Sequence, residues 1–126
     1  MKRKNKTKKA KLKAKLIEIV KKIVKERDNY TCQYCGKQVE GSNCHASHII
    51  PVSRDGRLAV DPSNMIVLCY HHHLNWWHKH PIEAAEWFNT KYGALYDALL
   101  IKYRENPKTG SIKESWYEDK IKEYTC

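Results

Sequence analysis

The sequence has no long hydrophobic run: none of its 126 residues belongs to a stretch of about 18 apolar residues, the minimum for a membrane-spanning helix. It also lacks the apolar centre of a secretory signal, because lysines and a glutamate interrupt the apolar residues between 12 and 24. We therefore expect no membrane partner and a cytoplasmic location. The chain is short enough to form one domain with a small core, which a bound metal would help to stabilise.

Cysteine is scarce and odd in number, and its spacing favours metal binding over disulfides. Of the five cysteines, Cys32 and Cys35 form a C-x2-C pair, whereas Cys44 and Cys126 have no partner at ligand spacing. Without a secretory signal, such a pair indicates a metal site or a redox pair in a reducing compartment. A redox pair of the thioredoxin type would need a βαβ context, which the pattern lacks.

Positive charge is concentrated at the N-terminal end. The formal net charge is +10, and residues 1–28 contain 13 Lys/Arg against 3 acidic residues, so the remaining 98 residues are neutral. A basic arm on a neutral body favours nucleic acid as partner, because lysines on phosphates release counterions. A solubilising tail and a membrane-surface or targeting segment are the alternatives. We single out Lys11, Lys15 and Lys22 as candidate DNA contacts.

The apolar pattern predicts an α+β fold with helices at both ends. Residues 1–10 are expected to be a disordered basic tail, and residues 11–28 an amphipathic basic helix. The segment 29–80 is dense in Cys, His and Asn and is expected to form a small core with two strands. The segment 81–126 is expected to be a helical extension.

Finer boundaries follow from local signals. Short apolar runs predict the two strands at 49–52 and 65–68. The helical extension is expected to break near Tyr92-Gly93 and again at Asn106-Pro107, and Ser111 with Glu114 predicts a capping box that begins the last helix. Six large side chains are expected to belong to the core: Trp87, Phe88, Tyr96, Leu99, Leu100 and Trp116.

Two pairs of potential metal ligands, Cys32-x2-Cys35 and Cys69-x2-His72, are separated by 33 residues. Two residues between ligands let one turn present both side chains to a tetrahedral ion, and thiolate and imidazole are donors that zinc prefers. Gly36 fits the sharp turn that such a site needs. Four donors close the coordination sphere, which predicts a structural zinc, although the neighbours His71 and His73 leave the choice of histidine open.

The order of motifs resembles the HNH (His-Asn-His) endonuclease family with its ββα-metal fold. The resemblance covers about residues 25–80 and lies in the first cysteine pair, His48-Ile49-Ile50-Pro51, Asn64, and Leu68-Cys69-x2-His72-His73. The Ala46-Ser47-His48 motif, Asp61-Pro62-Ser63-Asn64 and the following Trp-rich helix that begins at Pro81 are similar to the phage NinG-like branch.

Residue by residue, the resemblance implies that His48 is the general base and that Asn64 fixes its orientation. It implies that His73 holds one divalent metal such as Mg²⁺ or Mn²⁺. His78 is our candidate for a second ligand of that ion, and a solvent-exposed or DNA-facing histidine is the alternative. The expected function is nicking or double-strand cutting of DNA, with branched DNA, recombination and a phage-infected or bacterial cell suggested by the NinG-like pattern. Either a monomer or a homodimer would serve.

Two positions depart from the family pattern. Ser47 stands where a His or Asp metal ligand is common, so His45 or water would have to take that place. Trp77 stands four residues after His73, where many relatives have their last ligand, and His78 follows one residue later. Positions five apart on an ideal helix diverge by about 140°, so joint ligation by His73 and His78 requires an irregular turn.

Some residues have two interpretations. Arg54 and Arg57, in the loop after the base, are either phosphate contacts or ordinary surface arginines. Trp76 and Trp77 could stack on bases, but core packing is favoured. A non-catalytic zinc module that binds nucleic acid, with a decayed catalytic metal site, is the alternative function.

Overall fold

The computed structural model describes residues 7–51, 56–105 and 112–126, so Arg54 and Ser111 lie outside the described residues. The helices are α1 (Lys8–Arg27), α2 (Tyr70–His72), α3 (Pro81–Glu105) and α4 (Glu114–Thr125), and the strands are β1 (Cys44–His48) and β2 (Met65–Cys69). Short 3-10 turns occupy Gly41–Asn43, Leu58–Val60 and Pro62–Asn64, and a π-helical turn occupies His73–Trp77. The predicted α+β class is confirmed.

In the described residues the sheet consists of two strands, of which the second is buried in the core. β1 and β2 pair antiparallel from Cys44↔Cys69 to His48↔Met65, and all five residues of β2 are buried. The strand predicted at 65–68 is confirmed, whereas the one predicted at 49–52 is wrong. Pairing with β2 ends at His48, and the backbone N–H and C=O of Ile50 bond to the Asn64 side chain instead of to a strand.

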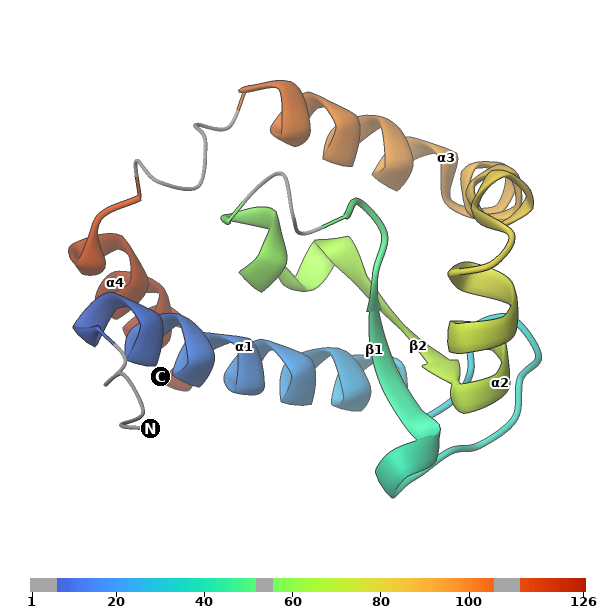
Figure 1. Ribbon diagram of the computed structural model, residues 1–126, viewed down its shortest axis with the longest axis horizontal. Coiled ribbons are helices and arrows are strands. Elements are labelled where there is room, and N and C mark those ends of the chain that lie inside the picture. Colours follow the sequence, from blue (N-terminus) through green and yellow to red (C-terminus); the bar gives the residue numbers. More distant parts are fainter. Residues whose placement is uncertain (1–6, 52–55, 106–111) are drawn as a thin grey trace, which may run out of the picture.

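The C-terminal half of helix α1 lies beside the two strands (Figure 1). Leu16, Val20 and Val24 recur every four residues and are fully buried in the core cluster with β2. The helix begins at Lys8, with the Thr7 hydroxyl capping the N–H of Ala10 at 3.1 Å, so residues 8–10 are helical rather than part of the expected tail.

The C-terminal end of α1 is fastened to β2 by two charged side chains. The guanidinium of Arg27 donates to the carbonyls of Pro62 and Met65 at 2.8 and 2.6 Å. Asp28 accepts from the backbone N–H of Val67 at 2.9 Å. Because hydrogen bonds to charged groups are the stronger ones, these contacts fix where the helix ends relative to the strand.

Helices α3 and α4 enclose the other sides. The predicted break is present, because Tyr92 has non-helical angles (φ −129°, ψ 42°) and kinks α3 there. Helix α4 begins at Glu114 without a side-chain cap, so the predicted capping box is not confirmed. The predicted break at Asn106-Pro107 lies outside the described residues, as do all of residues 106–111. Phe88 and Leu99 are fully buried, and the other four expected core residues pack half-buried against them.

Helix α4 lies beside the N-terminal half of α1, with Tyr117 buried at the contact and Lys8 3.4 Å from Glu118 (Figure 1). The basic helix is therefore a structural element with one face in the core, not a free arm. In the part of the chain that the structure describes, no helix combines the length and apolarity that a membrane crossing requires.

Candidate active site and metal centre

The four predicted zinc ligands converge on one point. The Sγ atoms of Cys32, Cys35 and Cys69 and a ring nitrogen of His72 all lie within 4.8 Å of one another. The Nδ1 atom of His72 lies 3.1 Å from the Cys69 sulfur and 3.8 Å from the Cys32 sulfur. With bonds of about 2.3 Å to sulfur and 2.1 Å to nitrogen, donors of a tetrahedral zinc are about 3.5–3.8 Å apart. The residues fit a structural zinc ion.

A tight turn brings the first pair of ligands together. Gly36 has φ +76°, in the left-handed region that favours glycine, and its N–H donates to the Cys32 carbonyl. Burial by itself raises the pKa of the Cys32 thiol, but hydrogen bonds from the backbone of Cys35, Cys69 and Tyr34 outweigh it and leave that pKa below its usual value. A thiolate, the form that binds metal, is thus favoured at Cys32.

His48 lies at the end of β1 with one ring nitrogen occupied. Its Nε2 is 2.9 Å from the carbonyl oxygen of Ala59, which can only accept, so Nε2 carries the proton and Nδ1 keeps its lone pair. Burial lowers the pKa of His48 below its ordinary value, the Ala59 bond opposes this, and Lys21 lowers it further. At neutral pH His48 is therefore an uncharged imidazole with a free proton acceptor.

Asn64 is fully buried and joins the two segments beside His48. Its Oδ1 accepts from the Ile50 N–H at 2.8 Å, and its Nδ2 donates to the carbonyls of Ile50 and Leu58 at 3.1 and 3.0 Å. Leu58 is the neighbour of Ala59, whose carbonyl holds His48. These bonds support the role predicted for Asn64, which is to orient the base.

The irregular turn required for His73 and His78 is the π-helical turn His73–Trp77. The N–H of His78 bonds to the carbonyl of His73 at 3.2 Å, an i to i+5 bond that aligns residues five apart. The two Nε2 atoms lie 3.2 Å from each other. Burial, then the charges of His78, His45 and His48, lowers the pKa of His73 to about 4, so its ring is neutral at pH 7.

Ser47 contacts the candidate metal ligand instead of serving as one. It is fully buried, and its Oγ lies 2.6 Å from His73 Nδ1 and 3.5 Å from the His45 carbonyl. With the hydroxyl proton directed at that carbonyl, Oγ accepts from Nδ1–H and leaves Nε2 of His73 for a metal. His45, two residues earlier on the same strand face, stacks on His73 with ring centroids 4.6 Å apart.

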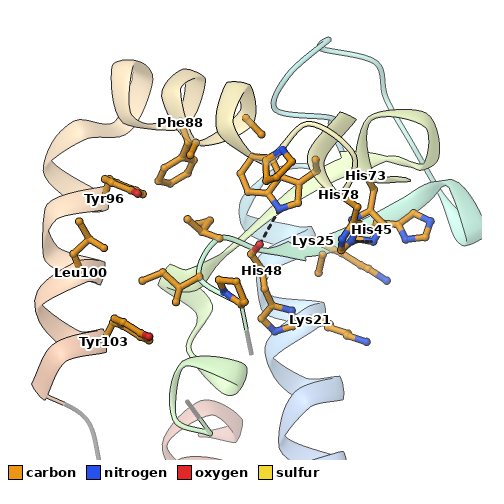
Figure 2. A pocket seen from close by; sticks show the side chains of 18 of the residues that line it. Lys21, Lys25, His45, His48, His73, His78, Phe88, Tyr96, Leu100 and Tyr103 are labelled. Carbon is orange, nitrogen blue, oxygen red and sulfur yellow. Dashed lines mark hydrogen bonds between the residues drawn. The ribbon is translucent and has the colours of Figure 1, made fainter. Parts of the chain in front are cut away.

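Trp77 has a contact that the sequence did not indicate. Its indole N–H donates to the backbone carbonyl of His48 at 2.8 Å (dashed in Figure 2). Trp77, which stands where we expected a metal ligand, therefore connects the π-helical turn to β1, the strand that ends at His48. Trp76 stacks on Tyr34 with centroids 4.0 Å apart, and Tyr34 also contacts the His72 ring, so Trp76 packs beside the cysteine cluster.

The histidines line a groove of about 1010 Å³ between α1 and α3. Figure 2 shows Lys21 and Lys25 on the α1 side, Phe88, Tyr96, Leu100 and Tyr103 on the α3 side and His48 between them, with His45, His73 and His78 grouped beside Lys25. The candidate site is therefore bordered by cationic side chains on one wall and by aromatic side chains on the other.

The predicted DNA contacts lie elsewhere on the surface. Lys11, Lys15 and Lys22 are exposed and do not line the groove. Arg57 lies over the Trp116 ring at 5.6 Å, in a smaller pocket on the α4 side, and Arg54 is outside the described residues. The sequence analysis missed Lys21 and Lys25, although their four-residue spacing beside the apolar stripe of α1 marks the flank of the helix.

Comparison with protein families identifies the segment that carries this site. Residues 32–76 match the HNH endonuclease family. The matched segment contains both cysteine pairs, His48, Asn64 and His73, and it supports a nuclease-type function and the HNH family in general. No curated protein and no solved structure gave a significant match.

The HNH match begins at Cys32 and ends at Trp76, just before the residue that departs from the family pattern. Helices α1, α3 and α4 lie outside it, as do His78 and the aromatic wall of the groove. The NinG-like branch suggested by the sequence stays a prediction.

Proposed function

We propose that this chain is a metal-dependent HNH endonuclease that hydrolyses phosphodiester bonds in DNA. The single observation that carries the proposal is His48, whose Nε2 is held by the Ala59 carbonyl so that Nδ1 is the proton acceptor, in the same groove as the paired Nε2 atoms of His73 and His78. A positioned base beside a candidate metal site is what hydrolysis of a phosphodiester requires.

The chemistry assigned to the protein side chains is proton transfer and orientation. Nδ1 of His48 takes a proton from a water molecule, the water oxygen bonds to phosphorus, and the bond from phosphorus to the 3′ oxygen breaks. The bonding pair leaves on the 3′ oxygen, which then takes a proton from solvent. The products carry a 5′-phosphate and a 3′-hydroxyl. Asn64 and the carbonyl of Ala59 hold the imidazole in the tautomer that accepts this proton.

The donor set fits a divalent cation. His73 and His78 present two imidazole nitrogens 3.2 Å apart. The His45 ring stacks on His73, and its Nε2 lies 2.9 Å from the Ser42 carbonyl, so Nδ1 is the nitrogen that His45 could offer in place of Ser47. When bound there, Mg²⁺ or Mn²⁺ would stabilise negative charge on a non-bridging phosphate oxygen and on the leaving 3′ oxygen. The separate Cys₃His cluster would hold zinc and keep the turn at Cys32 and Cys35 together with β2 and α2.

The finer substrate assignment comes from the sequence. The NinG-like motifs favour a phage-derived enzyme of recombination that acts on branched DNA inside a bacterial cell. The exposed lysines of α1 would contact phosphates without reading sequence, and the α2 segment would approach the minor groove near the cut. Nicking by a monomer and double-strand cutting by a homodimer are both compatible with one site per chain.

The test is nicking of supercoiled plasmid by wild type and His48→Ala in Mg²⁺, Mn²⁺ or EDTA. We expect cutting only with added metal, and loss of at least a hundredfold in the variant, since general bases contribute about 10²–10⁴. Zinc content and DNA affinity must be the same in both proteins. Equal nicking by the variant would overturn the assignment of the base.

One observation favours a second function, a zinc-containing module that binds nucleic acid without cutting it. Ser47 replaces a common ligand, so the second metal site has fewer protein donors than the family pattern provides. Such a module would bind plasmid DNA, retain zinc, and leave plasmid and branched DNA intact with every divalent metal.

A further inference from the structure

The groove has two walls of different chemistry. On α1, Lys21 and Lys25 are four residues apart, so their ammonium groups follow the helix in one row about 6 Å per step. On α3, Tyr96, Leu100 and Tyr103 are spaced i, i+4 and i+7, which places them on one face of the helix after the kink at Tyr92. Figure 2 shows these three side chains directed across the groove toward His48.

The α3 wall is only partly covered by the protein. Tyr96, Leu100 and Tyr103 pack against the core at half burial, whereas Leu99 between them is fully buried. Leu99 is therefore the residue of this segment that packs fully into the core. The two tyrosine rings contribute surface to the groove, whose volume is comparable to that of the largest small-ligand clefts, about 1,000 Å³. Aromatic surface facing a row of lysines is the composition of sites that bind single-stranded nucleic acid.

A paired duplex cannot use this wall. In a double helix the flat faces of the bases are stacked on one another, so only sugars, phosphates and base edges meet the protein. An unpaired strand exposes base faces that stack on aromatic rings while its phosphates stay accessible to lysines. Tyr96 and Tyr103 are about 10 Å apart along α3, roughly three base steps of 3.4 Å, so they would contact different bases.

We propose that this groove binds an unpaired DNA strand, with bases on Tyr96 and Tyr103 of α3 and phosphates on Lys21 and Lys25 of α1. The inference rests on the proposed nuclease function and adds a substrate feature: an unpaired segment next to the scissile phosphate at His48. A strand that follows the groove passes His48 and reaches the His73–His78 pair. DNA with an unpaired segment at the cut is then preferred to continuous duplex.

The test measures strand binding separately from cutting. A 12-nucleotide thymidine oligonucleotide with one central 2-aminopurine, a base whose fluorescence is quenched by stacking, is titrated into the protein in the His48→Ala background. Tyr96→Ala and Tyr103→Ala are compared with Tyr96→Phe and Tyr103→Phe, which keep the ring. Ile101→Ala is the matched control, because Ile101 is 53% exposed on the same helix and outside the groove. Zinc content and thermal melting verify that each variant folds.

We expect each alanine variant to weaken single-strand binding about tenfold, the lower end of the loss per stacked base, and to reduce the fluorescence quench, because one of the two stacking rings remains. The phenylalanine variants and Ile101→Ala keep both. In wild type, a duplex with an unpaired segment is cut faster than a continuous one. If single-strand affinity and fluorescence quenching are unchanged in both alanine variants, the inference is overturned, even where the wild type nicks plasmid. Absence of plasmid nicking together with ring-dependent strand binding overturns the proposed nuclease and retains the groove as a strand-binding site.

Discussion

At the scale of single residues, the site depends on which nitrogen of each histidine is free. The Ala59 carbonyl occupies Nε2 of His48 and leaves Nδ1 as a proton acceptor. Ser47 occupies Nδ1 of His73 and leaves Nε2 beside His78. One histidine is thereby prepared for a proton and the other for a metal, although their side chains are chemically identical.

Ser47→Ala tests whether the serine prepares the metal ligand. Removal of its Oγ leaves Nδ1 of His73 without its partner, so we expect Mn²⁺ affinity to fall about 10- to 100-fold, as for other contacts behind a metal ligand. Isothermal titration on zinc-loaded protein measures this. Ser42→Ala, at an exposed position just before β1, is the control. Unchanged Mn²⁺ affinity in Ser47→Ala would contradict the role.

The pH dependence of cutting tests the state of His48. Burial lowers the pKa of His48 below 6.5, and the base must be neutral to act. The rate is then constant at higher pH and falls tenfold per unit only below that lowered pKa, so cutting persists at pH 6.5. Single-turnover rates from pH 4.5 to 8 at saturating metal measure this. A rate that already declines between pH 8 and 7 is incompatible with a buried neutral base.

At the scale of elements, the π-helical turn accommodates a spacing of five residues between the two histidines, one more than the four expected from the family pattern. His78 lies five residues after His73, which an α-helix would place on different faces, and the wider turn brings the two Nε2 atoms to 3.2 Å. The same turn aims the Trp77 indole at the His48 carbonyl. The π-helical turn therefore keeps His73 and His78 together as a candidate ligand pair, and it adds a hydrogen bond between this turn and β1.

Ligand spacing and helical periodicity were sufficient to predict the cysteine cluster, α1, β2 and the break in α3. They were insufficient for β1, because the apolar run at 49–52 resembled a strand while the segment that pairs, Cys44–His48, is mostly polar. Residues Cys44–His48 pair with Met65–Cys69, and pairing stops there because the Asn64 side chain accepts a hydrogen bond from the backbone N–H of Ile50. The groove was also not predictable, since it depends on the separation of α1 from α3.

Loss of a zinc ligand is expected to loosen the element that carries Tyr34. In Cys35→Ser we expect no bound zinc, about 3 kcal/mol less stability and a melting temperature about 10 °C lower, because a structural metal contributes to folding. Calorimetry and metal analysis measure this, and tryptophan emission should change because Tyr34 stacks on Trp76. Cys126→Ser, an exposed cysteine outside the cluster, should do none of these. Zinc retained at wild-type stability in Cys35→Ser would refute the cluster.

At the scale of the whole molecule, α1 joins the core and the charged surface. Its buried face, Leu16, Val20 and Val24, supports β2, and α4 covers its N-terminal half. Lysines occupy its flank and its outer face, so the element that holds the site together also presents the positive charge. Because the rest of the chain is neutral, the net positive charge lies on α1 and the residues before it, and Lys21 and Lys25 bring part of it to the groove.

Salt dependence of DNA binding tests this distribution of charge. If Lys15 and Lys22 contact phosphates, each alanine variant weakens binding to every sequence alike and lowers the slope of log K against log salt by about 1. Fluorescence anisotropy with a labelled duplex at 50–300 mM KCl is the measurement. Lys122→Ala, an exposed lysine on α4, should leave the slope unchanged. Equal slopes for wild type, Lys15→Ala and Lys22→Ala would remove α1 from the DNA interface.

The central claim is that the chain holds a second, catalytic metal besides its zinc, and Mn²⁺ binding to zinc-loaded protein tests it most directly. Electron paramagnetic resonance counts free Mn²⁺ during titration of wild type and of His73→Ala, with Cys126→Ser as control. We expect one Mn²⁺ per wild-type chain, lost in His73→Ala while zinc remains. Zinc-loaded wild type that takes up no second ion, with or without DNA, would contradict the nuclease and leave a zinc module that only binds nucleic acid.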